Sequence, residues 1–554
     1  MLRKRWLGMC AVTLVLVLIA TFFAGCQGNN AVNNTWKPAD KTDNANSETK
    51  ETQPEDIYSA YRPKKYKVYV IRKANWLPGP VDNENGEMIK YYEEKLNARV
   101  IAENYDASRY NELLSLKIAS GETPDIFQVR SFADFRTFFD NQVLLGFSED
   151  LFKQLAPHIY DIFMNESPNA FDYTRLDGTN LYGVAGIRFH NQFAYPVVWR
   201  KDWLENVGIS KIPDTLEELE EALYRFVRND PDKNGKNDTY GLSTWGMNAI
   251  FAAFGYSPEP LGPGMNWTIR DGKIVYSGVQ PEMKEALKLL NKWYADGIID
   301  PEFITGENKG GDGRLSHSFI NNKVGFTSGQ EYFVWSPVEP IGINVTEFYK
   351  ANPDAPEDAI AVTLPPVGMN GRRLNHQWPV ITTSIYAFSK DLEKEPDKFG
   401  KILEVFDYTL SSYENYLTSW YGIKGKHWDV VDGVPTPVGA YTDLGERTKI
   451  GAYTHMGFIE PAVYWGEMYK ERTDWAHDLG LSTQVQGLRN ELLTALPSAS
   501  KYEAELVKMC QEAYISIITN DKPVDYFDEF VDNWKNAGGN KLTEEANIWY
   551  SSIK

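Results

Sequence analysis

In the first folded part of the chain, the spacing of apolar residues alternates between that of a strand and that of a helix. This alternation predicts alternating strands and helices. Residues 66–71 have the β-branched and aromatic character of a strand, and residues 97–101 and 124–129 share it. Between them, apolar side chains recur at helical spacing over residues 88–96 and 110–118. This strand–helix order is typical of a parallel, right-handed α/β layer.

A second α/β section follows with the same kind of pattern. Residues 196–199 predict a strand that leads into a short helix. Thr215 and Glu218 have the spacing of a capping box before an apolar stripe, and Pro281 begins another amphipathic helix. Residues 380–389 predict an apolar strand followed by a helix, and the end of the chain is helical and amphipathic.

The first 25 residues have the layout of a secretion signal. Three basic residues precede an almost unbroken apolar run over residues 7–23, and small residues then precede Cys26. Residues 23–26 resemble a bacterial lipobox, with Phe23 where Leu is more usual. The resemblance implies cleavage before Cys26 and a lipid on its sulfur. The alternative is an uncleaved anchor helix, for which the apolar run is short.

Composition narrows the class of protein. Residues 26–60 are polar and predict a flexible tether. The formal net charge is −19, and a surface that acidic repels nucleic acid, so we expect no nucleic-acid partner. Three cysteines leave no internal disulfide once Cys10 is removed and Cys26 carries a lipid. Cys510 lies in an apolar helical run and is expected to be a buried small hydrophobe.

Candidate ligand contacts follow from strand ends and from tryptophan. Aromatic residues make up 14% of the chain, and their apolar faces and polar tips suit amphipathic ligands such as sugars. Ligands bind beyond the carboxyl ends of strands in open α/β sheets, which nominates Asn75, Trp76, Arg130 and Ser131. Five further tryptophans lie near loops or Gly-flanked turns, where a ring can be exposed: Trp245, Trp335, Trp378, Trp420 and Trp465. The alternatives are core packing for each tryptophan and a surface ion pair for Arg130.

One acidic segment has the spacing of a cation-binding loop. Oxygen ligands fall at positions 1, 3, 5, 7 and 9 of an EF-hand pattern, with glycine at position 6; these ligands are Asp230, Asp232, Asn234, the Lys236 carbonyl and Asp238. Position 12 is Gly241 and not a bidentate Glu, which excludes a full EF-hand. We expect a structural calcium site. The alternative is a solvated turn rich in Asp and Asn.

No catalytic motif is evident. The chain has no Gly-x-Ser-x-Gly elbow, no His-Glu-x-x-His pair and no phosphate-binding Walker loop. A glycosidase needs only two suitably spaced carboxylates, which a chain with 76 acidic residues does not exclude. We therefore predict a protein that is not an enzyme and retain an extracellular hydrolase or lyase as the alternative.

Several local strings together resemble the family 1 extracellular solute-binding proteins of ABC importers, in particular the large carbohydrate-binding lipoproteins of Gram-positive bacteria. Each string is weak alone, but their order and spacing match from about residue 64 to the C-terminus. The strings are residues 121–126 (GETPDI), 199–204 (WRKDWL), 213–219 (PDTLEEL), 296–302 (DGIIDPE) and 421–425 (YGIKG).

The resemblance implies a periplasmic-binding-protein-like α/β fold, with two α/β lobes, a hinge and a ligand cleft between the lobes. It implies that residues 64–190 and 378–425 form the first lobe and that residues 191–377 and 426–554 form the second. Crossing segments are then expected near His190, near residues 375–378 and after residues 421–428.

The resemblance also implies a function. We expect a monomer that is held to the membrane by its lipid anchor, captures an oligosaccharide outside the cell and passes it to ABC permease subunits. Alginate-oligosaccharide-binding relatives place calcium in a similar short loop, with an acidic residue where this chain has Thr239. A ligand-presenting surface sensor is a further alternative, because it would use the same fold and cleft.

Overall fold

The computed structural model describes residues 56–77, 79–106, 109–256, 265–305, 315–368, 371–431, 433–457 and 459–553, without the side chains of Asn75 and Thr383. Residues 57–554 form one compact unit. The predicted signal, Cys26 and nearly all of the predicted tether lie outside the described residues. Within the described part, no helix is both long and apolar enough to cross a membrane.

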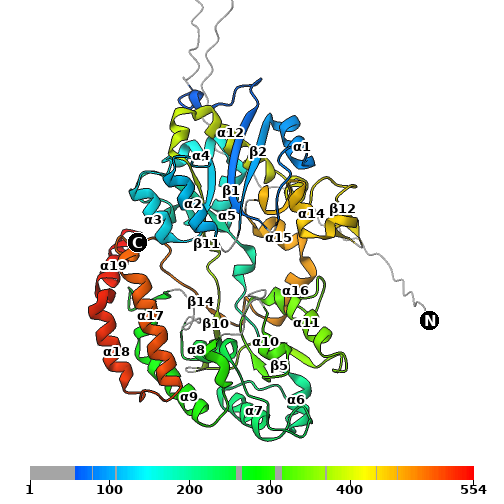
Figure 1. Ribbon diagram of the computed structural model, residues 1–554, viewed down its shortest axis with the longest axis vertical. Helices are drawn as coiled ribbons and strands as arrows, with labels where there is room; N and C mark the ends of the chain where they lie inside the picture. The colour runs from blue at the N-terminus through cyan, green and yellow to red at the C-terminus, as the bar shows by residue number, and fades with distance from the viewer. Residues whose placement is uncertain are drawn as a thin grey trace, which may run out of the picture. The chain divides into compact units, whose positions relative to one another are not determined.

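Five strands form the first sheet: β1 (Tyr69–Trp76), β2 (Ala98–Tyr105), β3 (Ile126–Val129), β4 (Gly183–Ile187) and β11 (Ile381–Phe388). Their order is β2-β1-β3-β11-β4 (Figure 1). β1 is parallel to β2 and β3, which confirms the predicted parallel layer. β11 is antiparallel to β3 and β4 and lies between them, although much of the chain separates it from both in sequence.

Helices pack against this sheet to form the first core, a cluster that includes Phe127 of β3 and Phe406 of α12. The predicted helices at residues 88–96 and 110–118 are confirmed as α1 and α2. The helices of this part are α1 (Glu87–Leu96), α2 (Tyr110–Ala119), α3 (Phe132–Asp140), α4 (Glu149–Leu155), α5 (Pro157–Glu166), α12 (Pro396–Thr409) and α13 (Tyr413–Tyr421).

Residues after 425 also pack into the first core. Trp428 contacts Tyr421 of α13 with ring centroids 6.3 Å apart, and Met456 and Met468 are buried in the same cluster. The sequence-based lobe boundary at residue 425 therefore differs from the packing, because these apolar side chains find their partners in the first core. The elements of this segment are β12 (Trp428–Val431), β13 (Val434–Pro437), α14 (Leu444–Lys449), α15 (Ala462–Met468) and α16 (Lys470–Leu479), of which β12, α15 and α16 supply side chains to the first core.

A second sheet has β5 (Val197–Arg200) between β8 (Phe326–Thr327) and β9 (Ile360–Thr363), antiparallel to both. The second core forms beside it and buries Trp199, Trp203 and Trp293, as expected from their periodic apolar surroundings. The other elements of this region are α6 (Lys201–Asn206), α7 (Leu216–Arg228), α8 (Thr244–Ala253), β6 (Trp267–Arg270), β7 (Lys273–Tyr276), α9 (Pro281–Ala295), α10 (His317–Ile320) and α11 (Ile343–Ala351).

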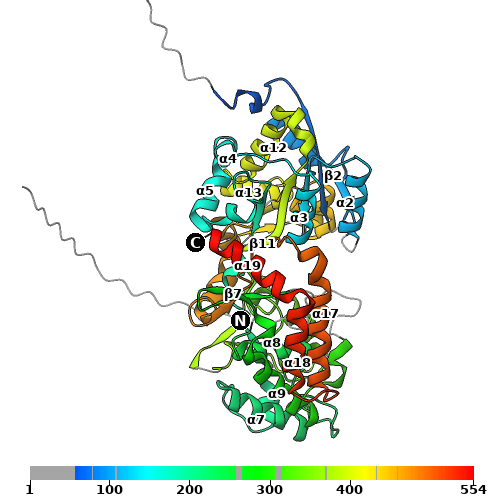
Figure 2. The same cartoon turned by 90° about the vertical axis from the view of Figure 1, so that its left-hand side faces the viewer.

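The C-terminal helices α17 (Ala499–Ile518), α18 (Tyr526–Trp534) and α19 (Asn540–Ser552) complete the second core. Figure 2 shows α17 and α18 side by side, and α17 also packs on α9. Cys510 of α17 is buried, and the Tyr276 hydroxyl donates a hydrogen bond to its sulfur at 3.4 Å. Its burial confirms the expected small core hydrophobe, and burial also raises the pKa of the Cys510 thiol to about 11.

The predicted capping box of α7 is realised in part. The Thr215 hydroxyl accepts the N–H of Glu218 at 3.2 Å, as expected of an N-cap. The Glu218 carboxylate accepts the N–H of Asp214 at 2.7 Å, not that of Thr215. The reciprocal bond is thus shifted by one residue, and α7 still begins at Leu216.

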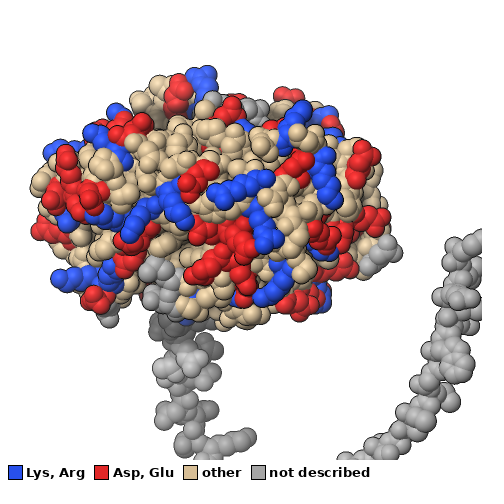
Figure 3. Space-filling view, turned by 90° about the horizontal axis from the view of Figure 1, so that it is seen from below, with Lys and Arg blue, Asp and Glu red and all other residues tan. Residues whose placement is uncertain are grey.

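Charged residues of both signs are interspersed on the surface. Figure 3 shows acidic and basic side chains side by side over the face drawn there.

Lys73 is an unusual core residue, because it lies in β1 with no exposed surface. Its side-chain nitrogen donates hydrogen bonds to the carbonyls of Thr454, at 3.1 Å, and His455. It also lies 5.6 Å from the ring centroid of Tyr386 and 5.4 Å from that of Phe406. Burial lowers the pKa of Lys73 to about 7, so folding favours the neutral amine.

Lys73→Met is expected to change how the free energy of unfolding depends on pH, because it removes the amine whose pKa is lowered by burial. An unfolded lysine has a pKa of about 10.4, so between pH 7 and pH 10 the unfolded chain binds more protons and Lys73 makes the wild type more stable as the pH rises. The stability of the variant relative to wild type should therefore fall by a few kcal/mol, in order of magnitude, from pH 7 to pH 10. Chemical denaturation at both pH values measures this difference. Lys90→Met, on the exposed face of α1, is the control. If Lys73→Met and the wild type differed in stability by the same amount at both pH values, the lowered pKa of Lys73 would be contradicted.

Candidate functional site

Two segments that run between the cores lie side by side. The Tyr195 N–H donates a hydrogen bond to the His376 carbonyl at 2.7 Å, and the Gln377 amide donates to the Asn191 carbonyl at 2.8 Å. His376 ends β10 (Leu374–His376), which pairs in parallel with β14 (Gln486–Leu488). These hydrogen bonds join the two segments where the chain passes between the first and second cores.

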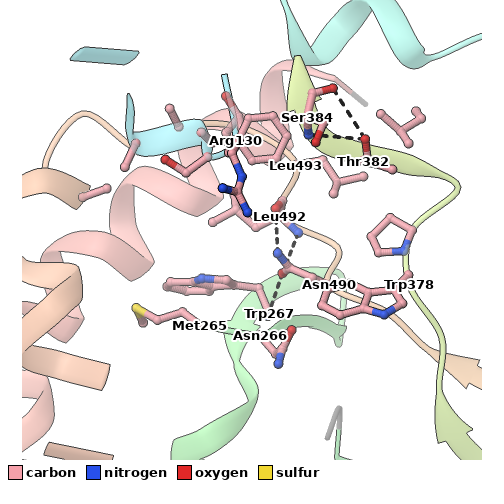
Figure 4. Close-up of a pocket in the computed structure, with 18 of the residues that line it drawn as sticks. Arg130, Met265, Asn266, Trp267, Trp378, Thr382, Ser384, Asn490, Leu492 and Leu493 are labelled. Carbon is pink, nitrogen blue, oxygen red and sulfur yellow. Dashed lines mark hydrogen bonds between the residues drawn. The ribbon is translucent and has the colours of Figure 1, made fainter. Parts of the chain in front are cut away.

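A cavity of about 690 Å³ opens beside this connection. Trp76 ends β1, and Arg130 and Ser131 follow β3, so the carboxyl ends of parallel strands supply one side of it. The opposite side comes from β6 and from the chain after β14. Figure 4 shows Arg130, Thr382 and Ser384 on one side of the cavity and Asn266, Trp267 and Asn490 on the other, with Trp378 beside them.

Trp378 is the most exposed aromatic ring of the cavity, with 37% of its surface exposed. Its indole N–H donates a hydrogen bond to the Tyr195 hydroxyl at 2.6 Å. The His376 ring lies edge-on between the two, with centroids 4.7 Å from each. Burial lowers the pKa of His376 to about 3, so this ring is neutral at pH 7. Tyr195 and His376 thus hold Trp378 in one orientation.

Arg130 and Trp76 form a second aromatic feature. The guanidinium carbon lies 5.5 Å from the Trp76 ring centroid, within the range of a cation–π contact. Ser131 is already engaged, because its hydroxyl accepts the Asp134 N–H at 3.0 Å and donates to the Asp134 carboxylate at 2.9 Å. Ser131 therefore caps α3 and reaches the cavity mainly as a neighbour of Arg130. The side chain of Asn75 lies outside the described residues.

The remaining four nominated tryptophans do not line the cavity. Trp335 is 1% exposed, packs against Phe319 with ring centroids 5.4 Å apart, and donates its indole N–H to the Gly329 carbonyl. Trp420 and Trp465 are buried in the first core, with their ring centroids 5.4 Å apart. Trp245 is half-buried.

Glycines explain why the expected exposure and the observed packing differ. A Cβ on Gly329 would lie 2.4 Å from the Trp245 ring, and one on Gly457 would lie 2.6 Å from the Trp420 ring. The glycines near these rings allow the backbone to pack directly on the indole. Gly329 and Gly457 are distant in sequence from the tryptophans that they contact, so the sequence around each tryptophan did not reveal this packing.

Sequence reasoning missed several lining residues. Arg188 directly follows β4, so the strand-end rule would have nominated it had Gly183–Ile187 been recognised as a strand. Trp267 and Asn490 carried no such signal. The Asn490 side-chain amide oxygen accepts the backbone N–H of Trp267 at 2.9 Å, a contact between residues far apart in sequence.

The predicted cation loop brings its side chains together. The Asn234 amide donates hydrogen bonds to Asp232 at 2.8 Å and to Asp238 at 3.1 Å, and its backbone N–H donates to Asp230 at 3.1 Å. Burial raises the pKa of Asp232, and the carboxylates of Asp230 and Asp238 raise it further. The three carboxylates therefore repel one another around one amide.

The arrangement at the end of this loop differs from a complete cation site. Thr239 directs its hydroxyl to the Phe226 carbonyl at 2.8 Å and is buried, so it is not available as a ligand. The backbone N–H of Lys236 donates to the Asn234 amide oxygen at 2.8 Å. Among the described residues, no group of three or more His, Cys, Asp or Glu side chains is arranged to hold a metal ion.

Comparisons with known proteins agree on one family. The sequence profile of the bacterial extracellular solute-binding proteins matches residues 87–394. Lipoprotein LipO of Bacillus subtilis is 25% identical over 480 residues, which cover 81% of this chain and 85% of that protein. The polygalacturonan/rhamnogalacturonan-binding protein YtcQ of Bacillus subtilis is 23% identical over 464 residues, covering 80% and 83%.

A solved structure shows the same fold. The crystal structure of the alginate-binding protein AlgQ2 without calcium ion is 19% identical, with a TM-score of 0.65, and the match covers 89% of this chain and 99% of that one. The α/β fold class predicted from the sequence is confirmed.

Tyr195→Phe is expected to loosen Trp378, because the indole N–H loses its acceptor. Loss of one hydrogen bond of about 1 kcal/mol should increase hydrogen exchange of the Trp378 indole proton several-fold, which NMR of ¹⁵N-labelled tryptophan measures. The buried Trp428 indole donates to the Gly422 carbonyl at 2.8 Å and should not change. Unchanged exchange at Trp378 would show that Tyr195 does not position it.

Proposed function

Because the chain belongs to the family of bacterial extracellular solute-binding proteins, whose members bind ligands and are not enzymes, we propose that it captures an oligosaccharide for an ABC importer. The observation that carries this proposal is the cavity beside the crossing segments, where Trp76, Trp267 and Trp378 gather. Indole faces suit the C–H face of a sugar ring. A relative, YtcQ, binds polygalacturonan and rhamnogalacturonan, which supports a carbohydrate ligand.

Polar groups around the tryptophans complete the proposed sugar site. Asn266, Thr382 and Ser384 line the cavity and offer amide and hydroxyl groups to the rim of a sugar. Asn490 is used within the protein, because its amide bonds fix Trp267 and Leu492. The site thus combines apolar platforms with a few placed polar groups, as is usual for ligand pockets.

The proposed mechanism is closure of two lobes around the ligand. The cavity takes residues from the strand ends of the first sheet and from β6 and α17, so closure would bring both sides onto the sugar. The ligand favours the closed form by binding it more tightly. We assign residues 64–190 and 378–425 to the first lobe and much of residues 191–377 to the second. The packing of Trp428 and Met468 supports placing residues 428–485 with the first lobe.

Location and partners follow from the same proposal. Cys26 would carry the lipid and residues 27–60 the tether, so the monomeric body would stand on the outer face of the membrane. ATP hydrolysis would belong to other subunits of the importer, which would receive the sugar from the cavity.

Calcium is proposed for the loop that holds Asp230, Asp232, Asn234, Lys236 and Asp238. The donor set fits a hard cation, since carboxylate, amide and carbonyl oxygens are the ligands calcium prefers. The carboxylates of Asp230, Asp232 and Asp238 gather around the Asn234 amide, and this concentration of negative charge supports the proposal. When bound, calcium would neutralise this repulsion and fix the chain after α7, without reaching the cavity.

A ligand screen tests the proposed function. Binding of an oligosaccharide at 100 times its dissociation constant adds about 2.7 kcal/mol to the stability of the folded state, which raises the melting temperature. We expect one class of glycan to raise it and to remain chemically unchanged afterwards. Trp378→Ala should reduce the shift, and Trp335→Phe, remote from the cavity, is the control. Failure of every oligosaccharide to bind would reject the proposal, and a consumed glycan would indicate an enzyme.

Calcium is expected to raise the melting temperature of the wild type relative to a chelator. Asp232→Asn and Asp238→Asn should each remove most of this increase, because each deletes a charged ligand. Asp354→Asn, an exposed acid elsewhere, should retain it. Equal melting temperatures of the wild type with calcium and with chelator would show that the loop is a plain turn.

A further inference from the structure

The second side of the cavity is apolar where it borders the second core. Five aliphatic side chains line the cavity and also belong to the second core: Met265, Leu492, Leu496, Ala499 and Leu542, hereafter the aliphatic wall. They come from the chain before β6, from the chain between β14 and α17, and from α17 and α19. Each is 6% exposed or less, so only a small part of each side chain faces the cavity.

Hydrogen bonds within the protein use the backbone polar groups beside this wall. The Asn490 side-chain oxygen accepts the backbone N–H of Trp267 at 2.9 Å and that of Leu492 at 3.3 Å. The Asn490 amide donates to the Leu492 carbonyl at 3.0 Å, and the Trp267 carbonyl accepts the N–H of Glu491 at 2.9 Å. The backbone N–H groups of Trp267 and Leu492 are therefore engaged. A sugar hydroxyl placed against the wall would lose water without gaining either of them as a partner.

Glu503 lies beside the wall and reports on its surroundings. It follows Ala499 by four residues on α17, so the two side chains share one face of the helix, and both line the cavity. Burial raises the pKa of Glu503. Protein atoms thus keep water from a charged group at this end of the cavity, as an apolar environment does.

The first side of the cavity has the opposite character. Thr382 and Ser384 line it with hydroxyl groups. Figure 4 shows these two residues away from Met265 and Trp267. A ligand that spans the cavity would meet polar groups on one side and methyl and methylene groups on the other. Its hydroxyl rim suits the first side, and the part that faces the second core has to be apolar.

On the basis of the proposed function, we propose that the aliphatic wall binds an apolar substituent of the sugar, namely an O-acetyl or O-methyl group in place of one hydroxyl group. Both substituents end in a methyl group, and both remove a hydroxyl donor that the wall does not satisfy. The cavity therefore selects an oligosaccharide that is substituted at one such position over the same chain without the substituent.

Calorimetric titration of the purified full-length protein tests this assignment. The probes are xylo-, manno- and galacto-oligosaccharides, each unsubstituted and as its singly O-acetylated and singly O-methylated isomers. Any other oligosaccharide that raises the melting temperature joins them with its own isomers. At least one substituted isomer should bind about tenfold more tightly than the unsubstituted chain. Burial of a methyl group contributes about fourfold of this, and removal of the unpartnered hydroxyl contributes the rest.

The same titrations give a second reading and identify the substituent. The preferred isomer should bind with a more negative heat-capacity change than the unsubstituted chain, because more apolar surface is buried. The O-acetyl and O-methyl isomers are compared separately, so the tighter of the two names the group that the wall accepts.

Met265→Gln tests the wall itself, because it places an amide of similar size among the aliphatic groups. The ratio of the affinities for the substituted and the unsubstituted chain should fall several-fold. Met509→Gln is the matched control, since Met509 is half-buried on α17 and is not one of the residues that line the cavity; it should keep the wild-type ratio. The melting temperature of each variant shows whether it is folded, and the comparison of ligands on the wild type needs no variant.

Three outcomes would contradict the proposal. If no substituted isomer bound more tightly than its unsubstituted chain, this inference would be overturned while oligosaccharide binding stood. An unchanged affinity ratio in folded Met265→Gln would overturn the role of the aliphatic wall. Absence of binding by every probe and by every oligosaccharide of the melting-temperature screen would overturn both this inference and the proposed function.

Discussion

The buried hydrogen bonds that join the crossing segments are the constraint on which the site depends. The Asn375 amide donates to the Tyr195 carbonyl at 2.9 Å and to the Ser328 hydroxyl at 3.0 Å, and Asn375 has no exposed surface. A buried amide left without partners costs about 1–3 kcal/mol, so these bonds keep the segments aligned. Trp378 follows Asn375 after His376 and Gln377, so these contacts also fix the backbone that carries its ring.

The cavity is a product of strand polarity as much as of side-chain chemistry. β1, β3 and β4 all run in one direction, and each ends at or just before a residue of the cavity: Trp76, Arg130 and Arg188. β11 enters between β3 and β4 from the opposite direction and contributes Thr382 and Ser384 near its start. The end of the first sheet at which β1, β3 and β4 finish thus supplies the Trp76 ring, two arginines and two hydroxyl groups.

Titratable groups behave differently in the core and in the loop after α7. Lys73 and His376 are buried without a carboxylate partner among the contacts described above, and burial alone shifts their pKa values towards the neutral form. Burial also raises the pKa of Asp232, and the carboxylates of Asp230 and Asp238 raise it further. The shift of Lys73 belongs to the dry interior of the first core, the shift of His376 belongs to the connection between the cores, and the shift of Asp232 accompanies three gathered carboxylates.

The sequence by itself determined the elements whose signal is local. The helical and strand periods of residues 88–129 were sufficient for α1, β2, α2 and β3, and the strand-end rule was sufficient for Trp76 and Arg130, because both depend on neighbouring residues. Only the tertiary structure decided that β11 joins the first sheet and that Trp428 packs in the first core. It also decided which tryptophans are buried and that Asn490 holds Trp267 at the cavity. The physical reason is that these outcomes depend on contacts between residues far apart in the chain, which local period and composition do not encode.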